Sequence, residues 1–243
     1  MTDVSALLEQ VPSLPDTDDQ VDPDWATGRI GAVHTWWRER AGVSAPIPGW
    51  IDVFGNREGG LGGGLHALDA LDATVVVPFM GTTSNVDDIA ARAVIASFSN
   101  REASLVCHQP LGMPDVQWMA LATSVREQCT RMWAHRGEPL TLLDVAASPA
   151  MSFATGTLIA ASHQGRAVLL DDLTTLAAAL IVDRLGYRAK VWWGWASTSE
   201  DPARQVAADR LGLDPLLDLD VSDPQAMGAR AVIALLELRP LES

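Results

Sequence analysis

Short apolar runs alternate along this chain with longer segments whose apolar residues recur at helical spacing. Unbroken apolar runs of about four to eight residues indicate buried strands, and apolar residues repeated every three or four positions indicate helices. The pattern predicts strands at Thr74–Val77, Ala103–Cys107, Arg166–Asp171 and Ala189–Trp195. It predicts helices at Trp25–Gly42, Val86–Phe98, Asp115–His135 and Met151–Ser162, one starting near Thr174, and two more before Ser243.

Glycine and proline mark where several of these segments end. Gly42 follows the first helix as a plausible C-cap, and Pro46 prevents the helix from continuing. The run Gly55–Gly64 is rich in glycine and is expected to be a loop or turn. Its part Gly59–Gly64 lacks the preceding strand and following helix that a phosphate-binding glycine motif requires, so a flexible connection is favoured there. One face of the first helix is expected to carry its apolar residues, Ile30, Val33, Trp36 and Trp37.

Alternation of short apolar strands with long helices favours an α/β fold. We expect three αβα layers, with a mostly parallel Rossmann-like sheet and a small helical subdomain formed by the N- and C-terminal segments. Ligands of such folds bind beyond the carboxyl ends of the strands. A binding site is therefore expected in the segments that follow Val77, Cys107, Asp171 and Trp195.

The amino-acid composition argues against several kinds of partner and location. A formal charge of −14 argues against a nucleic-acid partner, since phosphates need cationic side chains. The two cysteines, Cys107 and Cys129, suit a reduced compartment, and no apolar stretch is long enough for a membrane span. We therefore expect a cytoplasmic protein without a membrane partner. Residues 1–24 are expected to form an acidic tail, most acidic over Asp16–Asp24, and residues 25–243 a single α/β domain.

Histidine, cysteine and tryptophan residues could each have a metal-binding, catalytic or ligand-stacking role. The five histidines show no metal-binding spacing, so no metal site is expected. Cys107 precedes His108, but adjacency in sequence does not make a nucleophile and its base. Trp193 and Trp195 lie near the end of a predicted strand, where they could fill the core or a subunit interface, or stack on a planar ligand.

Motifs in the last hundred residues indicate a protein family more specifically than the composition does. Four segments follow one another along this part of the chain: Val168–Asp171, Thr174–Leu180, Ser199–Arg204 and Leu213–Leu219. Together they resemble the nicotinate-nucleotide–dimethylbenzimidazole phosphoribosyltransferases, and the match extends from Ala146 to the end of the chain. Fainter matches cover Phe79–Asn85 and Leu111–Asp115. The first 75 residues resemble a shortened remnant of the family's longer N-terminal region.

The resemblance implies a reaction that makes the lower-ligand nucleotide of cobalamin without a cofactor. A benzimidazole nitrogen attacks C1′ of nicotinate mononucleotide, nicotinate leaves, and a glutamate takes a proton from the base. At that glutamate's position this chain has Gln225, which cannot accept a proton near neutral pH. The family's lysine falls on Leu121, and a second acidic position falls on Ala150.

Several residues remain candidates for a nucleotide or phosphate site. They are Gly81, Thr82, Thr83, Ser84, Gly112, Asp171, Ser199 and Asp201. Asp171 has a structural alternative as the N-cap of the helix near Thr174. Ser199, Asp201 and Arg204 are equally consistent with a helix cap and a surface pair. Gln225 itself is consistent with an ordinary surface residue.

Three functions agree with this pattern. The first is a weakly active or non-catalytic relative that binds a pyridine mononucleotide or a benzimidazole-like base, or that pairs with an active subunit. The second is an active phosphoribosyltransferase, with a group such as His66, Glu58 or Asp52 replacing the lost base. The third is a scaffold that binds an unrelated ligand. A homodimer, or a heterodimer with a homologue, is expected in the first two cases.

Overall fold

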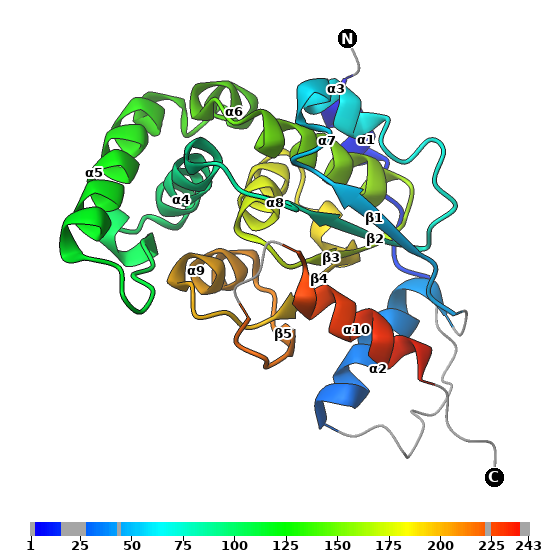
Figure 1. Ribbon diagram of the computed structural model, residues 1–243. Coiled ribbons are helices and arrows are strands. Elements are labelled where there is room, and N and C mark those ends of the chain that lie inside the picture. The colour runs from blue at the N-terminus through cyan, green and yellow to red at the C-terminus, as the bar shows by residue number, and fades with distance from the viewer. Residues whose placement is uncertain (1–2, 16–27, 43–44, 222–224, 239–243) are drawn as a thin grey trace.

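The computed structural model describes residues 3–15, 28–42, 45–221 and 225–238. Its centre is a five-stranded parallel sheet in the order β1-β2-β3-β4-β5 (Figure 1). The strands are β1 (Pro48–Asp52), β2 (Val75–Phe79), β3 (Ala167–Leu170), β4 (Trp193–Ser197) and β5 (Pro215–Leu217). In the register, Val75 of β2 pairs with Pro48 of β1 on one side and with Ala167 of β3 on the other.

Ten α-helices and four short 3₁₀ helices occupy the described residues. The α-helices are α1 (Val4–Glu9), α2 (Gly28–Ala41), α3 (Gly60–Leu65), α4 (Asn85–Ser99), α5 (Asp115–Met132), α6 (Pro139–Ala146), α7 (Pro149–His163), α8 (Leu173–Leu185), α9 (Pro202–Leu211) and α10 (Met227–Glu237). The 3₁₀ helices are η1 (Arg57–Gly59), η2 (Ala103–Val106), η3 (Trp133–His135) and η4 (Ala189–Trp192).

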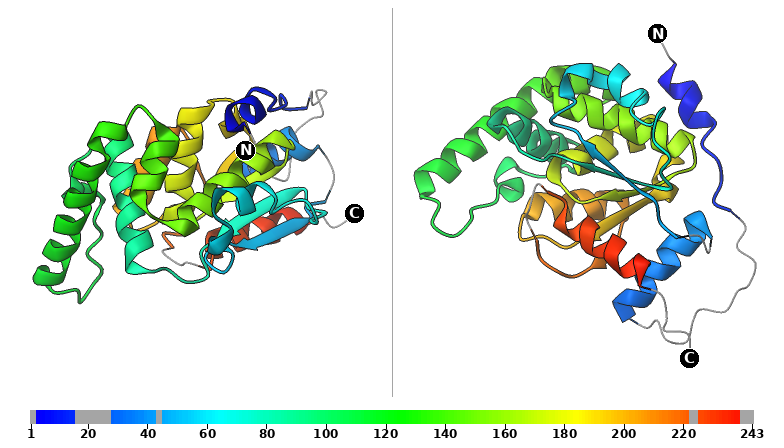
Figure 2. Two further views of the ribbon diagram at one scale, coloured as in Figure 1. Left: turned by 90° about the horizontal axis from the view of Figure 1, so that it is seen from above. Right: turned by 45° about the vertical axis from the view of Figure 1, so that its right-hand side comes forward.

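Successive side chains of each strand point to opposite faces of the sheet, so a separate hydrophobic core forms on each face. Val75 and Val77 point to one face with Leu169, whereas Val76 points to the other with Val168. Helices α2 and α10 cover the first face, and most of the remaining helices cover the second (Figures 1 and 2). The three-layer fold is therefore confirmed, with α2 and the C-terminal helix α10 forming the small outer layer, whereas the N-terminal helix α1 belongs to the other layer.

Most predicted elements are present, and the errors have physical causes. Ala103–Cys107 is not a strand but contains the 3₁₀ helix η2, and the first half of Ala189–Trp195 is η4. Strands β1 and β5 were missed because each is short and contains proline, which is tolerated at sheet edges. Gly42 takes the left-handed conformation expected of a C-cap, but Ile30 on the same helix is exposed.

The prediction of a loop at Gly55–Gly64 is wrong, because this run contains η1 and most of α3. Its glycines allow α3 to lie directly against α7. A Cβ on Gly64 would collide with the carbonyl oxygen of Phe153, and one on Gly156 would collide with that of Leu61. The contact, which needs bare backbone on both helices, offsets glycine's weak helix propensity.

At the N-terminus, residues 3–15 include α1, which packs against α7 and buries Val4 and Leu8. Asp3 caps this helix by accepting hydrogen bonds from the amides of Ser5 and Ala6. The acidic run Asp16–Asp24 lies outside the described residues, so the boundary at residue 24 stays a prediction.

Candidate functional site

The carboxyl ends of all five strands meet at one edge of the sheet, because the strands are parallel. This carboxyl edge brings together the loop Gly81–Ser84 after β2, Asp171 after β3, and Ser199 with Asp201 after β4. Asp52 ends β1 and packs against Gly81, where an added Cβ would lie 3.2 Å from its carboxylate. Most of the predicted site residues therefore lie along one edge.

The loop Gly81–Ser84 leads into two helix starts joined by a buried carboxylate. Ser84 caps α4 and donates to Asp87 Oδ2 over 2.5 Å. Ser148 caps α7 and donates to Asp87 Oδ1 over 2.5 Å. Asp87 thus places a negative charge at the helix start that would otherwise attract a phosphate. Thr82 and Thr83 remain exposed in the loop before it.

Asp171 does not cap the helix that follows it, because the cap of α8 is Asp172. Instead, Asp171 Oδ2 accepts a hydrogen bond from the amide of Ala229 over 3.0 Å, in the first turn of α10. Gly228 fits against the same carboxylate, where a Cβ would come within 2.6 Å of Oδ1. Asp171 therefore holds the start of α10, next to the turn that carries Gln225. Gln225 is exposed, and its carbonyl accepts from Arg230 Nε over 3.0 Å.

Asp172 is an acidic residue whose importance the sequence did not reveal. Its Oδ1 accepts from the Thr175 amide over 2.9 Å, and within the described residues its buried Oδ2 has no hydrogen-bond partner. Burial raises the pKa of Asp172 to about 6, and the nearby charge of Asp171 adds to this effect. The Thr175 amide and the charge of Arg204 lower it by less.

Asp201 is a helix cap, but the expected surface pair is a buried network. Asp201 caps α9 through the Ala203 amide and binds Arg92 through both oxygens, over 3.0 and 2.7 Å. Arg92 also donates to Asp88 over 3.0 Å. Burial lowers the pKa of Arg92, while hydrogen bonds and charge from Asp201 and Asp88 raise it by more. Arg92 was missed, although an arginine among the apolar residues of α4 was a usable signal.

Arg204 and Ser199 also have internal partners. Arg204 is buried and donates to the carbonyl oxygens of Asp171, over 2.7 Å, and Val221. Ser199 Oγ accepts from the Asp201 amide over 3.1 Å. Much of the polar chemistry at the carboxyl edge is therefore directed at the protein itself.

Other candidates lie in the core or away from the edge. Trp193 and Trp195 are fully buried, so the core interpretation is confirmed for both. Burial raises the pKa of Cys107 to about 11, which keeps it a thiol. Gly112 has a φ of +88° in a turn before α5, and among the described residues no atom lies within 4 Å of its Cβ position.

Leu121 and Ala150, where the resemblance implies charged residues in the family, have apolar surroundings. Leu121 on α5 is partly buried and packs against the main core. Ala150, in the first turn of α7, is fully buried. A charged side chain at either position would have to displace packed apolar atoms.

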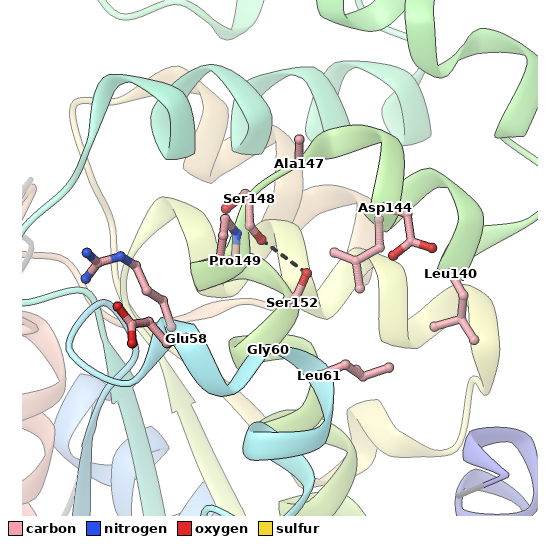
Figure 3. Close-up of a pocket in the computed structure, with 11 residues that line it drawn as sticks. Glu58, Gly60, Leu61, Leu140, Asp144, Ala147, Ser148, Pro149 and Ser152 are labelled. Carbon is pink, nitrogen blue, oxygen red and sulfur yellow. Dashed lines mark hydrogen bonds between the residues drawn. The ribbon is translucent and has the colours of Figure 1, made fainter. Parts of the chain in front are cut away.

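One hollow is a groove of about 860 Å³ across the start of α7 (Figure 3). Figure 3 shows Glu58 at one end of this groove, Leu140 and Asp144 at the other, and Ser148 with Pro149 between them. Its full lining is Arg57, Glu58, Gly60, Leu61, Leu140, Leu143, Asp144, Ala147, Ser148, Pro149 and Ser152. We refer to it as the α7 groove.

A second hollow of about 540 Å³ lies beside β1 and includes Asp52, Asn56 and Glu58. Two of the three suggested replacements for the lost base, Asp52 and Glu58, therefore line hollows. The third, His66, is exposed and pairs with Asp69 over 2.9 Å.

The described residues lack two kinds of feature. They contain no cluster of three or more histidine, cysteine or acidic side chains arranged to hold a metal ion. No helix in the same part of the chain combines the length and hydropathy needed to cross a bilayer.

Comparison with known proteins identifies the family. The model of the DBI_PRT phosphoribosyltransferase family matches residues 63–239. The nicotinate-nucleotide–dimethylbenzimidazole phosphoribosyltransferase of Streptomyces avermitilis is 30% identical over 172 residues, covering 70% of this chain and 46% of the relative. That of Corynebacterium efficiens is 31% identical over 147 residues, covering 60% of this chain and 40% of the relative.

Solved structures share the fold. The crystal structure of CobT from Thermus thermophilus superposes with a TM-score of 0.66 at 23% identity, over 74% of this chain and 54% of that one. The chain spans about half the length of the curated relatives it matches. The family model covers most of the chain, from the end of α3 through α10, and the chain belongs to the nicotinate-nucleotide–dimethylbenzimidazole phosphoribosyltransferase (CobT) family.

Proposed function

We propose that this chain is a CobT-like protein of cobalamin lower-ligand metabolism that binds a pyridine mononucleotide or a benzimidazole-type base with little or no turnover. The observation that carries the proposal is the side chain at position 225. Glycosyl transfer to a benzimidazole releases a ring proton, and a positioned general base contributes roughly 10²–10⁴-fold to such a step. The Gln225 amide accepts a hydrogen bond but takes no proton.

The phosphate side supports the same proposal. Leu121 and Ala150 replace charged residues of the family motifs and pack in apolar surroundings. Asp87 adds a carboxylate at the start of α4, close to the loop Gly81–Ser84. An anionic substrate would lose the attraction of a lysine at Leu121 and meet repulsion at Asp87, whereas the loss of an acidic side chain at Ala150 would not weaken its binding. We therefore expect weak nucleotide binding through the exposed hydroxyls of Thr82 and Thr83 and the backbone amides of this loop.

The proposal includes association with a second copy or with a longer homologue. The chain spans 46% of the Streptomyces avermitilis relative, so a partner could supply missing parts of a site. Val116 and Met119 of α5 are exposed, and α5 lies far from the α2 and α10 layer (Figure 1). Light scattering coupled to gel filtration, with and without a full-length homologue, measures this association.

Calorimetry and a nicotinate-release assay test the function together. We expect dimethylbenzimidazole or nicotinate mononucleotide to bind, with nicotinate release in the presence of both at least about 100-fold slower than for a full-length relative. In Gln225→Glu, release should rise if the proton acceptor is the main deficit. Turnover by the unaltered chain at the relative's rate would overturn the proposal, as would failure of both compounds to bind.

A further inference from the structure

A cluster of arginines lies where helices α4, α8 and α9 end. Cζ of Arg184, in α8, lies 5.3 Å from the centre of the Phe98 ring, and Arg210 of α9 donates to the Phe98 carbonyl oxygen over 3.2 Å. Arg136, which follows η3, donates to the carbonyl oxygen of Ser97. Helices that follow parallel strands run back along the sheet, so these helix ends lie at its amino edge, opposite the carboxyl edge described above.

The helix ends account for only part of this cluster. Carbonyl groups at a helix C-terminus carry partial negative charge and attract cations, which explains the positions of Arg136 and Arg210. Arg101 follows α4 and is exposed, and in the described part of the chain its guanidinium has no hydrogen bond or ion pair. Arg126 pairs with Glu102 over 2.5 Å, but both side chains are more than half exposed, so another carboxylate can compete for this arginine.

Arg101 and Arg126 border a hollow of about 380 Å³, which we call the amino-edge hollow. It lies between the start of η2 and the end of α5, and α5 packs beside α4 (Figure 1). Its remaining lining residues are Glu102, Ala103, Cys129, Thr130 and Trp133. Trp133 is 66% exposed, and Cζ of Arg136 lies 4.4 Å from the centre of its ring. The hollow therefore combines two cations with an exposed aromatic surface.

We infer that the amino-edge hollow docks an acidic peptide segment of a partner protein, with a carboxylate at Arg101 and a neighbouring apolar side chain against Trp133. Charge complementarity supports this partner. The chain carries a formal charge of −14, so on average its surface repels an acidic segment, whereas the arginine cluster attracts one. Tryptophan and arginine are also the residue types that most often dominate the energy of protein interfaces.

The size of the hollow favours a peptide over a free small molecule. About 380 Å³ is near the lower limit of small-molecule sites, which bury most of their ligand. A small acid in this hollow would leave much of the Trp133 ring uncovered, whereas a chain that continues past the hollow can cover it. The inference goes beyond the proposed function and does not depend on it, because the hollow and the loop Gly81–Ser84 lie at opposite edges of the sheet.

Fluorescence anisotropy with a labelled peptide tests the docking. The probe is a fluorescein-labelled peptide with one phenylalanine between two pairs of aspartates, titrated with the full chain at about 50 mM salt. Arg101→Met should weaken its binding about tenfold, because the peptide carboxylate loses its cationic partner. The matched control is Arg29→Met, since Arg29 is an exposed arginine of α2, on the opposite face of the sheet. This control should change the affinity less than about twofold.

A second peptide, with alanine in place of phenylalanine, tests the aromatic contact. The unaltered chain should bind it about tenfold more weakly than the first peptide. Trp133→Ala should weaken binding of the phenylalanine peptide by a similar factor and leave binding of the alanine peptide unchanged. A variant that had merely lost its fold would bind both peptides less well. Because Trp133 is largely exposed, the fold should tolerate this substitution.

Several results would overturn the docking surface. Equal losses in Arg101→Met and Arg29→Met would mean that the peptide responds only to overall charge. Equal losses for the two peptides in Trp133→Ala would exclude an apolar contact at this ring. Phenylpropionate that binds as tightly as the phenylalanine peptide would make the hollow a site for free small acids. Failure of the unaltered chain to bind the phenylalanine peptide would also overturn the inference, and would leave the proposed function standing.

Discussion

Replacing Asp172 with asparagine should change how stability depends on pH. The carboxyl group is 2% exposed and caps α8 through one oxygen, while among the described residues the other oxygen has no partner. Its pKa is raised from 3.8 to about 6, with burial as the main cause. Between these two values the folded chain keeps a proton that the unfolded chain has released. The free energy of unfolding therefore falls as pH rises through this window.

The size of the effect follows from the two pKa values. A difference of about two units corresponds to about 3 kcal/mol lost between pH 4 and pH 7. A negative charge at a helix start regains at most about 2 kcal/mol, so burial outweighs the helix dipole. Asparagine caps helices about as well as aspartate and does not titrate. Asp172→Asn should therefore match the unaltered chain near pH 4 and exceed its stability by up to about 3 kcal/mol at pH 7.5.

Urea unfolding at pH 4, 5.5 and 7.5 measures this difference. Asp72→Asn is the matched control, because Asp72 is exposed and the same substitution there should leave the pH profile unchanged. A constant difference between Asp172→Asn and the unaltered chain across all three pH values would refute the reasoning. So would a variant that is less stable than the unaltered chain at pH 7.5.

Two further predictions concern packing and the buried ion pair. Gly64→Ala should destabilise the fold by about 1–3 kcal/mol, because the added methyl group clashes with α7. Gly62→Ala on the same helix is the control, since its added methyl group meets no atom within 4 Å. In thermal unfolding this control should be neutral or stabilising. Equal midpoints for the two would contradict the close packing. Arg92→Met leaves Asp201 buried without its cation and should cost about 3–5 kcal/mol in urea unfolding. Arg126→Met, which breaks an exposed pair, should change little, and a similar loss in both would contradict the role of burial.

Sequence patterns predicted the interior of the fold better than its edges. The run Val168–Leu170 is apolar on both faces, which only a central strand requires, and it forms β3. The edge strands β1 and β5 carry proline and are short, so local propensity pointed elsewhere. The glycines of α3 indicated a loop because the helix depends on contact with α7, about ninety residues away in sequence. The contact between α3 and α7 therefore determines that this segment is helical, although its local propensity favours a loop.

The candidate site residues lie along one edge of the sheet, but the sequence did not predict their partners there. Asp171 and Asp201 are candidates for a ligand site with a structural alternative each, and in the structure they bind the start of α10 and Arg92. Such pairings join residues far apart in sequence, so no local motif records them. Asp172 follows Asp171 directly in the sequence, and nothing in the pattern distinguished the two carboxylates. The burial of Asp172 is visible only in three dimensions.

Gln225, Ala150 and Leu121, the positions where the resemblance implies charged family residues, differ in how easily they could hold a charge. Gln225 is exposed at the start of α10, so a glutamate there needs no repacking and also favours the helix dipole. Ala150 is fully buried and Leu121 contacts the core, so a glutamate or lysine at these sites would need to desolvate a charge or displace neighbours. Gln225→Glu therefore isolates proton transfer from folding, whereas Leu121→Lys changes stability as well as phosphate attraction. Activity gained in Gln225→Glu alone would show that the missing base limits turnover more than the missing cation does.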